Sequence, residues 1–399
     1  MAAGLTQMAR SAPEAARGER PVTTYREDLI TAALTVWPIT AMFFDGRGHN
    51  NETGQESFFS LAHLFLYAGM TAVGIWVGLL VTRYQLAAGA DPRKSLIPDL
   101  KAIPVGYGVA ILGLLTLALG GPTDFIWHAA YGFEVGVDAI YSPPHLLLFF
   151  GGLLVSSTGI RSMWAKQDVV LDFKGFAPVL LSTMLFIGVS GFITMYLSAF
   201  MTNVSPTSDF VADYQANFKD DFTDQTQSLN AGLTGYGDDQ WPFYYYSAGH
   251  GMASMIVTTL VLFGPILLNL RRWSVPFGAT TAIFTGYGLL VNIMTEYRDI
   301  VLIIPLIITG LAIDVLARRL GGKREDGRLT LGGIRTIGPV AAMILWVSYY
   351  SVLALDKGIG WEPTLWVGAL IIGTMTGFAV AFLVAPPSYG PRLVEADND

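Results

Sequence analysis

The stretch DFIWHAAYGFEVGVDAIYSPPHLLL, residues 124–148, joins two long apolar segments and carries a carboxylate and two imidazoles. Asp124 and His128 are four residues apart, so on a helix their side chains lie on one face. Ser142 can cap the next helix, and the proline after it suits the first helical position, which puts His145 in the first turn. One carboxylate and two imidazoles around a short connection can form a site for a divalent transition metal.

The composition indicates a polytopic integral membrane protein. Hydrophobic residues make up 52% of the 399 and charged residues 14%, and the mean hydropathy is +0.48. Apolar runs of membrane-spanning length recur along the chain. No basic patch suited to a phosphate backbone occurs, so no nucleic-acid partner is expected. The chain has no Cys, which excludes disulfides and thiolate ligands.

The sequence predicts an all-α membrane helical bundle with about ten transmembrane helices. A tail over 1–27 precedes the transmembrane domain over 28–385, and a second tail follows over 386–399. The predicted spans are 28–45, 58–83, 103–126, 143–163, 176–201, 242–270, 275–297, 299–317, 334–354 and 364–385.

The basic residues predict the orientation. All but four of the 24 Lys and Arg residues lie on one side of these spans. The positive-inside rule makes that side cytoplasmic, with both termini there, and the expected location is a bacterial plasma membrane. The acidic connection over 202–241 would then be an outer lid or a partner-facing loop. The same orientation puts all five histidines at or near the outer ends of spans: His49, His63, His128, His145 and His250.

A pattern of Asp-x-x-x-His, followed by a second His that opens the next helix, occurs twice. Its first copy is Asp45, His49 and His63, and Asp45 precedes Asp124 by 79 residues. A third, degraded copy keeps only His250. A histidine at the membrane interface costs less free energy than one buried in the membrane, and this alone would explain where the histidines lie. It does not explain the repeated spacing of the Asp-x-x-x-His pattern. The pattern predicts an internal repeat of helical hairpins over about 28–83, 103–163 and 176–270.

Two further residues are candidate auxiliary groups near the predicted cluster. His250 belongs to the third copy, and Glu296 lies near the end of the seventh predicted span. Two interpretations of Glu296 are open: it serves the outer cluster, or it forms an interfacial charge set with Arg298 and Asp299.

The motif around Asp124 resembles the C subunit of the copper membrane monooxygenases, the particulate methane and ammonia monooxygenase group. That subunit carries an Asp, then Trp-His, then an aromatic residue followed by Ser or Thr, Pro, one residue and His. Here Asp124 is followed by Trp127-His128 and later by Ser142-Pro-Pro-His145.

A second motif of the same subunit resembles Asp45 with Gly48-His49 and His63. The resemblance covers roughly residues 40–150. This chain departs from the pattern because the order of the two motifs is reversed and because it has more predicted spans.

The resemblance implies one copper site at Asp124, His128 and His145 and a second or alternative site at Asp45, His49 and His63. Imidazole and carboxylate ligands also suit zinc or iron. The resemblance further implies a monooxygenase or oxidase acting on a small apolar substrate, with partner membrane subunits or a homo-oligomer in the lipid bilayer.

Two other functions remain open on the sequence. In the first, the Asp/His cluster is an ion site in a transporter or metal-handling protein. In the second, the chain is a non-catalytic structural subunit. Against transport, no ladder of polar residues is evident across the inner halves of the predicted spans.

Overall fold

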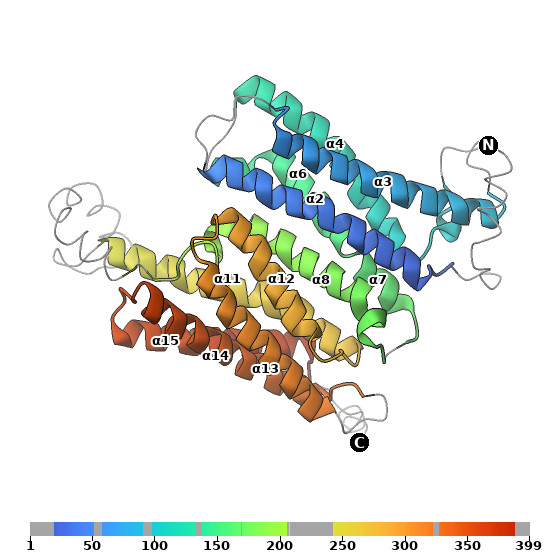
Figure 1. Cartoon of the computed structure of the whole chain (residues 1–399). Helices are drawn as coiled ribbons and strands as arrows, with labels where there is room; N and C mark the ends of the chain where they lie inside the picture. Colours follow the sequence, from blue (N-terminus) through green and yellow to red (C-terminus); the bar gives the residue numbers. More distant parts are fainter. Residues whose placement is uncertain are drawn as a thin grey trace, which may run out of the picture. The chain divides into compact units, whose positions relative to one another are not determined.

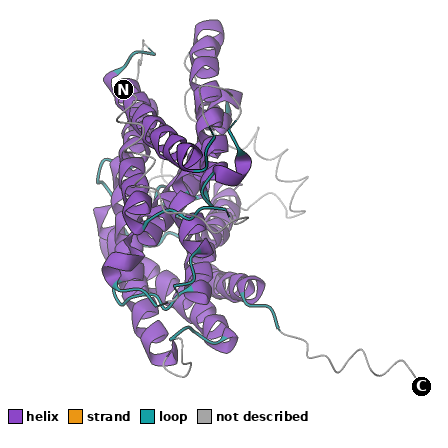
Figure 2. Cartoon of the chain, turned by 90° about the vertical axis from the view of Figure 1, so that its right-hand side faces the viewer, coloured by secondary structure: helices purple, strands orange, loops and turns teal. Residues whose placement is uncertain are grey.

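A computed structural model of the chain describes residues 20–51, 58–90, 98–132, 137–168, 170–205, 207, 242–321 and 327–387. Within these residues the regular secondary structure is helical and no strand occurs, which confirms the predicted all-α fold (Figure 2). Most of the two predicted tails and of the acidic loop over 202–241 lies outside the described residues.

Nine helices in the described part of the chain are long and apolar enough to cross a membrane. They hold 21 to 27 residues, and at 1.5 Å per residue even the shortest spans roughly the 30 Å of a hydrocarbon core. The seventh predicted span, over 275–297, contains only the 16-residue helix α12 (Ala279–Met294). The chain leaves α12 through Glu296 and Tyr297, both with a positive φ, so this segment is shorter than predicted.

Two compact units make up the chain. Unit 1 comprises Met1–Tyr196 with Ala282–Ile303, and unit 2 comprises Leu197–Thr281 with Ile304–Asp399. Unit 1 contains most of α12 and the following helices (Figure 1): α2 (Tyr25–Asn51), α3 (Leu61–Ala87), α4 (Tyr107–Tyr131), α5 (Val137–Tyr141), α6 (Pro143–Ser156), α7 (Thr158–Ala165) and α8 (Phe173–Ile193).

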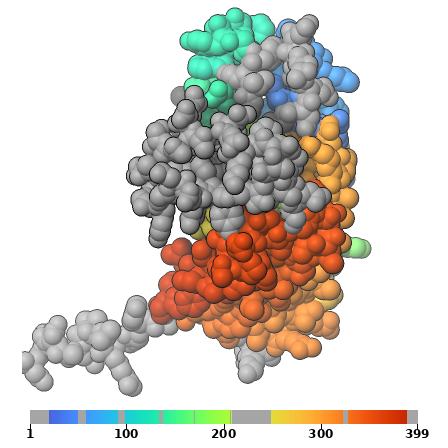
Figure 3. Space-filling view, turned by 90° about the vertical axis from the view of Figure 1, so that its left-hand side faces the viewer, coloured from blue at the N-terminus to red at the C-terminus, as the bar shows by residue number. Residues whose placement is uncertain are grey.

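Unit 2 is built on four long helices: α11 (Pro242–Arg272), α13 (Ile303–Gly321), α14 (Leu331–Asp356) and α15 (Pro363–Val384). Helices α14 and α15 cross closely at Gly338. A Cβ atom added there would lie only 2.5 Å from that of Ala381, so the helices could not approach this far with a larger residue at the position. The red residues of these two helices form a continuous surface in Figure 3. Large apolar side chains such as Met343 and Met375 are exposed on them, as expected where helices meet lipid.

Helix α2 is longer than the predicted span over 28–45, since it continues to Asn51. The glycines in this segment do not end it. A Cβ atom at Gly46 would lie 2.5 Å from the Phe192 ring of α8, so the missing side chain lets the two helices approach. As a result Asp45 and His49 lie one turn apart on the same helix.

Helices α4 and α6 also cross on glycines. A Cβ atom at Gly151 would lie 2.8 Å from the Gly113 carbonyl oxygen, and one at Gly113 would lie 2.9 Å from the Gly151 carbonyl oxygen. Small residues at such crossings let membrane helices approach until their backbones touch. This crossing holds the Asp124 turn of α4 against the first turn of α6.

A buried charged network, which the sequence analysis did not predict, lies at the Glu27 end of unit 1. Asp28 is fully buried and accepts hydrogen bonds from Tyr107 and Ser162, each at 3.0 Å, and from Lys166 Nζ at 2.5 Å. Glu27 pairs with the Arg83 guanidinium and accepts a hydrogen bond from a tyrosine. The network joins α2 to α3, α4 and α7, and each carboxylate has a cationic partner, as burial requires.

Gly151→Val tests the glycine crossing. The added methyl groups would meet Leu117 and the α4 backbone, so we expect the free energy of unfolding to fall by about 1–3 kcal/mol. The measurement is thermal unfolding in detergent micelles. Gly368→Val on α15 is the matched control, because a Cβ atom there meets nothing within 4 Å. Equal unfolding temperatures for the two variants would contradict the crossing.

Candidate metal centre

The first group consists of Asp124, His128 and His145, and it comes from α4 and α6. Asp124 and His128 lie one turn apart near the end of α4, and His145 is the third residue of α6. Asp124 and His128 are buried, and the His145 side chain is 12% exposed. Asp124 Oδ1 lies 3.3 Å from His128 Nε2 and 3.1 Å from His145 Nε2. The structure therefore brings together the three residues that the sequence analysis singled out.

The Nδ1 atom of each histidine ring in this group, on the side away from Asp124, lies against a backbone carbonyl oxygen. His128 Nδ1 lies 3.2 Å from the Gly132 oxygen, and His145 Nδ1 lies against the Ala139 oxygen. A carbonyl only accepts, so Nδ1 carries a proton in each ring and Nε2 faces Asp124. Two imidazole nitrogens and a carboxylate thus face a common point, where either a proton on Nε2 or a bound cation can offset the carboxylate charge.

The second group consists of Asp45, His49 and His63, and it is built in the same way from α2 and α3. Asp45 Oδ2 lies 3.8 Å from His49 Nε2 and 3.2 Å from His63 Nε2. His63 is the third residue of α3, and its Nδ1 lies 2.9 Å from the Phe58 carbonyl oxygen. Asp45 Oδ1 and His49 Nε2 are buried and make no hydrogen bond.

The helix starts that present the two second histidines differ in their caps. Ser60 Oγ accepts a hydrogen bond from the His63 N–H, which caps α3. Ser142 occupies the predicted cap position of α6, but its buried hydroxyl makes no capping hydrogen bond. Two prolines follow it, and a proline has no N–H to donate, so the fixed backbone angles of these prolines start the helix instead.

The two groups lie next to each other. The rings of His49 and His145 have centroids 6.3 Å apart, and the Phe58 ring lies 5.2 Å from His63 and 6.3 Å from His128. Both groups therefore belong to one region of unit 1.

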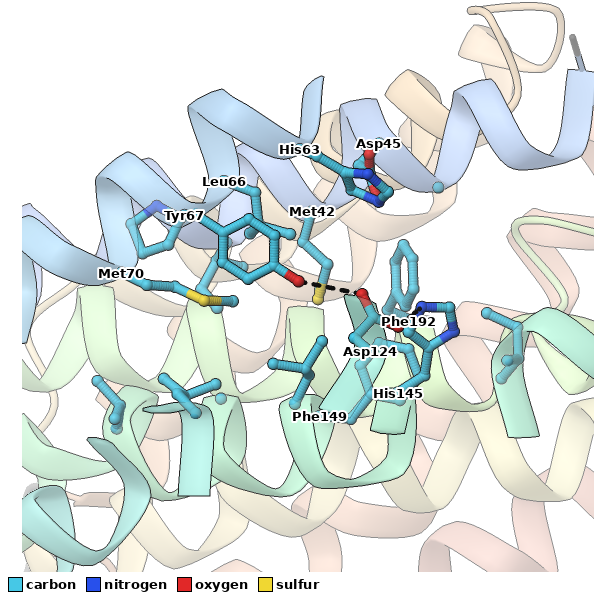
Figure 4. A pocket seen from close by; sticks show the side chains of 18 of the residues that line it. Met42, Asp45, His63, Leu66, Tyr67, Met70, Asp124, His145, Phe149 and Phe192 are labelled. Carbon is cyan, nitrogen blue, oxygen red and sulfur yellow. Dashed lines mark hydrogen bonds and ion pairs between the residues drawn. The ribbon is translucent and has the colours of Figure 1, made fainter. Parts of the chain in front are cut away.

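Tyr67 links the groups, and the sequence analysis missed it. Its hydroxyl donates a 3.0 Å hydrogen bond to Asp124 Oδ2, while its ring lies 6.2 Å from that of His63 (Figure 4). Tyr67 follows His63 by four residues on α3, which places both on one helix face. That spacing is the signal by which the sequence could have identified it.

An apolar cavity of about 70 Å³ adjoins both groups. Asp45, His49, His63, Asp124 and His145 contribute its polar wall. The rest of the lining is mostly apolar, and Figure 4 labels five of these side chains around the Asp124 carboxylate: Met42, Leu66, Met70, Phe149 and Phe192.

The two auxiliary candidates belong to neither group among the described residues. His250 lies on α11 in unit 2. The Glu296 carboxylate lies 3.0 Å from Arg47 Nε, so its partner comes from the segment between Asp45 and His49. This contact places Glu296 beside the part of α2 that carries Asp45 and His49.

Each group could hold a metal ion. Its three candidate ligand atoms all lie within 4.8 Å of one another. Two ligands about 2.1 Å from a tetrahedrally bound ion are roughly 3.4 Å apart. The four measured Asp–His separations, from 3.1 to 3.8 Å, bracket that value.

Comparison of the chain with family models, with curated protein sequences and with solved structures finds no match. The candidate centre therefore has to be interpreted from its own geometry.

His145→Ala tests the first group. Removing one of three ligands should cost the purified protein about one equivalent of bound metal, since an Asp and one imidazole form a much weaker site. Metal content is measured by elemental analysis after loading with copper and desalting. His250→Ala is the matched control, and its content should equal that of the wild type. Unchanged metal in His145→Ala would rule out the first group.

Tyr67→Phe tests the link between the groups. Loss of the hydroxyl removes the hydrogen bond that orients Asp124, and such losses weaken metal binding by roughly tenfold or more. Copper titration against a competing chelator measures the affinity. Tyr131→Phe, at the exposed end of α4, serves as the control. Equal affinities for the two variants would show that the hydroxyl has no part in holding Asp124.

Proposed function

We propose that this chain is the metal-binding membrane subunit of a copper-dependent monooxygenase or oxidase acting on a small apolar substrate. The observation that carries the proposal is the shared wall of the apolar cavity: its lining includes three histidines and both aspartates of the two Asp/His groups. A substrate in this cavity would lie beside every metal that the groups hold.

The donor set is consistent with copper. The ligands offered are neutral imidazoles and a carboxylate, and the chain has no thiolate to compete. Zinc and iron accept the same ligands, so the choice of copper rests on the resemblance of the two motifs to the copper membrane monooxygenases. We interpret the two groups as the two copies of an internal repeat, since each presents its second histidine from the third residue of a helix.

The residues of the chain have distinct roles in this proposal. His128, His145 and Asp124 would hold one ion, and the other group a second. The backbone carbonyls behind the rings fix the orientation of the imidazoles, and Tyr67 fixes Asp124. Copper bound by these residues would supply dioxygen activation.

The cavity walls select the substrate. Phe149 and Phe192 are buried and exclude water from the carboxylate end. An apolar cavity of about 150 Å³ takes up benzene or xenon, so one of about 70 Å³ suits a molecule of only a few heavy atoms. Oxidation would place one oxygen atom in a C–H bond, giving an alcohol. The other would leave as water, with two protons and two electrons from a quinol.

Ion transport or metal handling is the second candidate, because the Glu27–Asp28 network supplies buried charge at the other end of α2. Asp28 and Asp45 are 17 residues apart, roughly 26 Å along the helix. The segment between them, however, is apolar around Ile39 and Phe43, both of which are buried. No continuous polar path therefore joins the network to the metal groups along α2.

An assay of catalytic turnover distinguishes the proposed oxidation from ion transport, metal handling and a structural role. The chain is isolated in its native membrane complex, loaded with copper and supplied with a quinol and propane. We expect oxygen uptake matched by propanol. His63→Ala combined with His145→Ala should lower the rate at least a hundredfold, while His250→Ala leaves it unchanged. Bound metal without turnover would favour transport or metal handling, and no bound metal would favour a structural subunit.

A further inference from the structure

The two Asp/His groups lie close enough for an ion in one to affect the binding of an ion in the other. They meet at His49 and His145, whose ring centroids are 6.3 Å apart, and the Nε2 atom of each ring faces the aspartate of its own group. An ion bound to an imidazole nitrogen lies roughly 3.3 Å from the centre of the ring. Ions in the two groups would therefore be no more than about 13 Å apart.

The surroundings of the groups screen such charges weakly. The side chains of His63, His128 and Asp124 are at most 2% exposed. The cavity that adjoins both groups is lined mostly by apolar side chains, among them Met42 and Phe149. Dissolved salt screens exposed charges over roughly 10 Å, but it affects buried charges much less. The repulsion between two bound ions would therefore persist at physiological salt.

A divalent ion adds positive charge to a group even where it replaces a proton. The single carboxylate of each group stabilises one proton on an Nε2 atom. A divalent ion that displaces this proton raises the charge of the group by one, and an ion that displaces none raises it by two. Fixed charges elsewhere in the protein change the affinity of each group, but they do not enter the interaction between the two ions.

The resulting repulsion is large enough to measure. Two unit charges about 13 Å apart, at an effective dielectric constant of about 20, change a dissociation constant roughly ninefold. This is the smallest effect, because a shorter separation or a larger added charge increases it. The effect is also reciprocal, so each ion weakens the binding of the other by the same factor.

We propose that the two groups are coupled through charge, so that a divalent ion in one weakens the binding of a divalent ion in the other about tenfold or more. The Asp124 group fills first, since both of its Asp–His separations are 3.3 Å or less. The Asp45 group then fills only when the divalent ion is in excess, or when the charge in the Asp124 group falls.

Reduction of the first ion would be such a fall in charge. When the quinol of the proposed oxidation is oxidised, one of its two electrons can reduce the ion in the Asp124 group, and its protons leave in the product water. The reduced ion carries one positive charge less, so the Asp45 group binds its own ion more tightly. This role rests on the proposed function, whereas the coupling itself requires only that the groups bind metal.

Tyr67 provides the alternative explanation for any coupling between the groups. Its hydroxyl donates a hydrogen bond to Asp124, and its ring lies 6.2 Å from that of His63. A movement of Tyr67 on metal binding would link the groups mechanically, and such a link would not depend on the charge of the ion. Tyr67→Phe removes the hydrogen bond and keeps the ring, so it separates the two explanations.

The experiment measures Zn(II) dissociation constants for the full chain in lipid nanodiscs, by competition with a chelator. In the wild type, the second constant reports the Asp45 group while the Asp124 group is filled. His128→Ala and His145→Ala each weaken the Asp124 group, so their first constant reports the Asp45 group beside an empty neighbour. We expect both variants to bind this ion about tenfold or more tightly than the wild type binds its second ion. His63→Ala combined with His145→Ala disables both groups and measures background binding.

The same titration with Ag(I) tests whether the coupling comes from charge. A monovalent ion adds at most one charge to each group, so the logarithm of the coupling factor should be about a quarter of the Zn(II) value or less. Tyr67→Phe should change the affinity of the Asp124 group but leave the Zn(II) coupling factor as it is in the wild type.

Three results would overturn the proposal, and they differ in what they say of the proposed function. Equal Zn(II) constants in the wild type and the two single variants would refute the coupling alone, because two independent ions can still support oxidation. A factor that is the same for Zn(II) and Ag(I), or that disappears in Tyr67→Phe, would replace charge with a mechanical link. A wild type that binds neither Zn(II) nor copper would refute the coupling and the proposed function together.

Discussion

The structure around the two Asp/His groups depends on how a carboxylate is stabilised inside a membrane protein. An anionic side chain between membrane helices has no bulk water to solvate it, so it has to be paired. Asp124 is 1% exposed, and the groups around its Oδ1 are two imidazole nitrogens. The Nδ1 atoms of those rings lie against carbonyl oxygens. Either a proton on one Nε2 or a bound cation can offset the charge of the carboxylate, and a bound cation would engage both imidazole nitrogens at once.

Close helix packing is the condition for that arrangement. Asp124 and His145 lie on different helices, and their atoms approach to 3.1 Å only because α4 and α6 touch at Gly113 and Gly151. On the other side of the region, Gly46 allows α2 to approach α8, and the helix continues far enough to carry His49. The glycines thus set the spacing of the groups, although none of them is a ligand.

The sequence predicted what is local and missed what depends on packing. Asp124 with His128, and Asp45 with His49, follow from helical spacing alone, and the start of α6 after Ser142 follows from its prolines. The predicted span over 28–45 is shorter than α2, which continues to Asn51. Glycines usually weaken a helix, whereas here Gly46 allows close contact with Phe192.

Contacts between distant segments could not be predicted in this way. Asp28 meets Lys166 across 138 residues, and no local spacing indicates such a contact. The adjacency of the two Asp/His groups is of the same kind. The sequence predicted each group at the end of its own hairpin and left open whether the ends meet. The packing of α2, α3, α4 and α6 brings the ring centroids of His49 and His145 to 6.3 Å.

The two groups are similar in composition but differ in tightness. In the Asp124 group both Asp–His separations are 3.3 Å or less, while the Asp45 group has one at 3.8 Å. The Asp45 side chain is also more exposed, at 12% against 1% for Asp124. A preorganised, dry site binds an ion more tightly than a looser one, because less ligand movement is needed. The Asp124 group is therefore the better candidate for a permanently held ion. The Asp45 group, whose ligand atoms are less tightly arranged, is the better candidate for a weakly held ion.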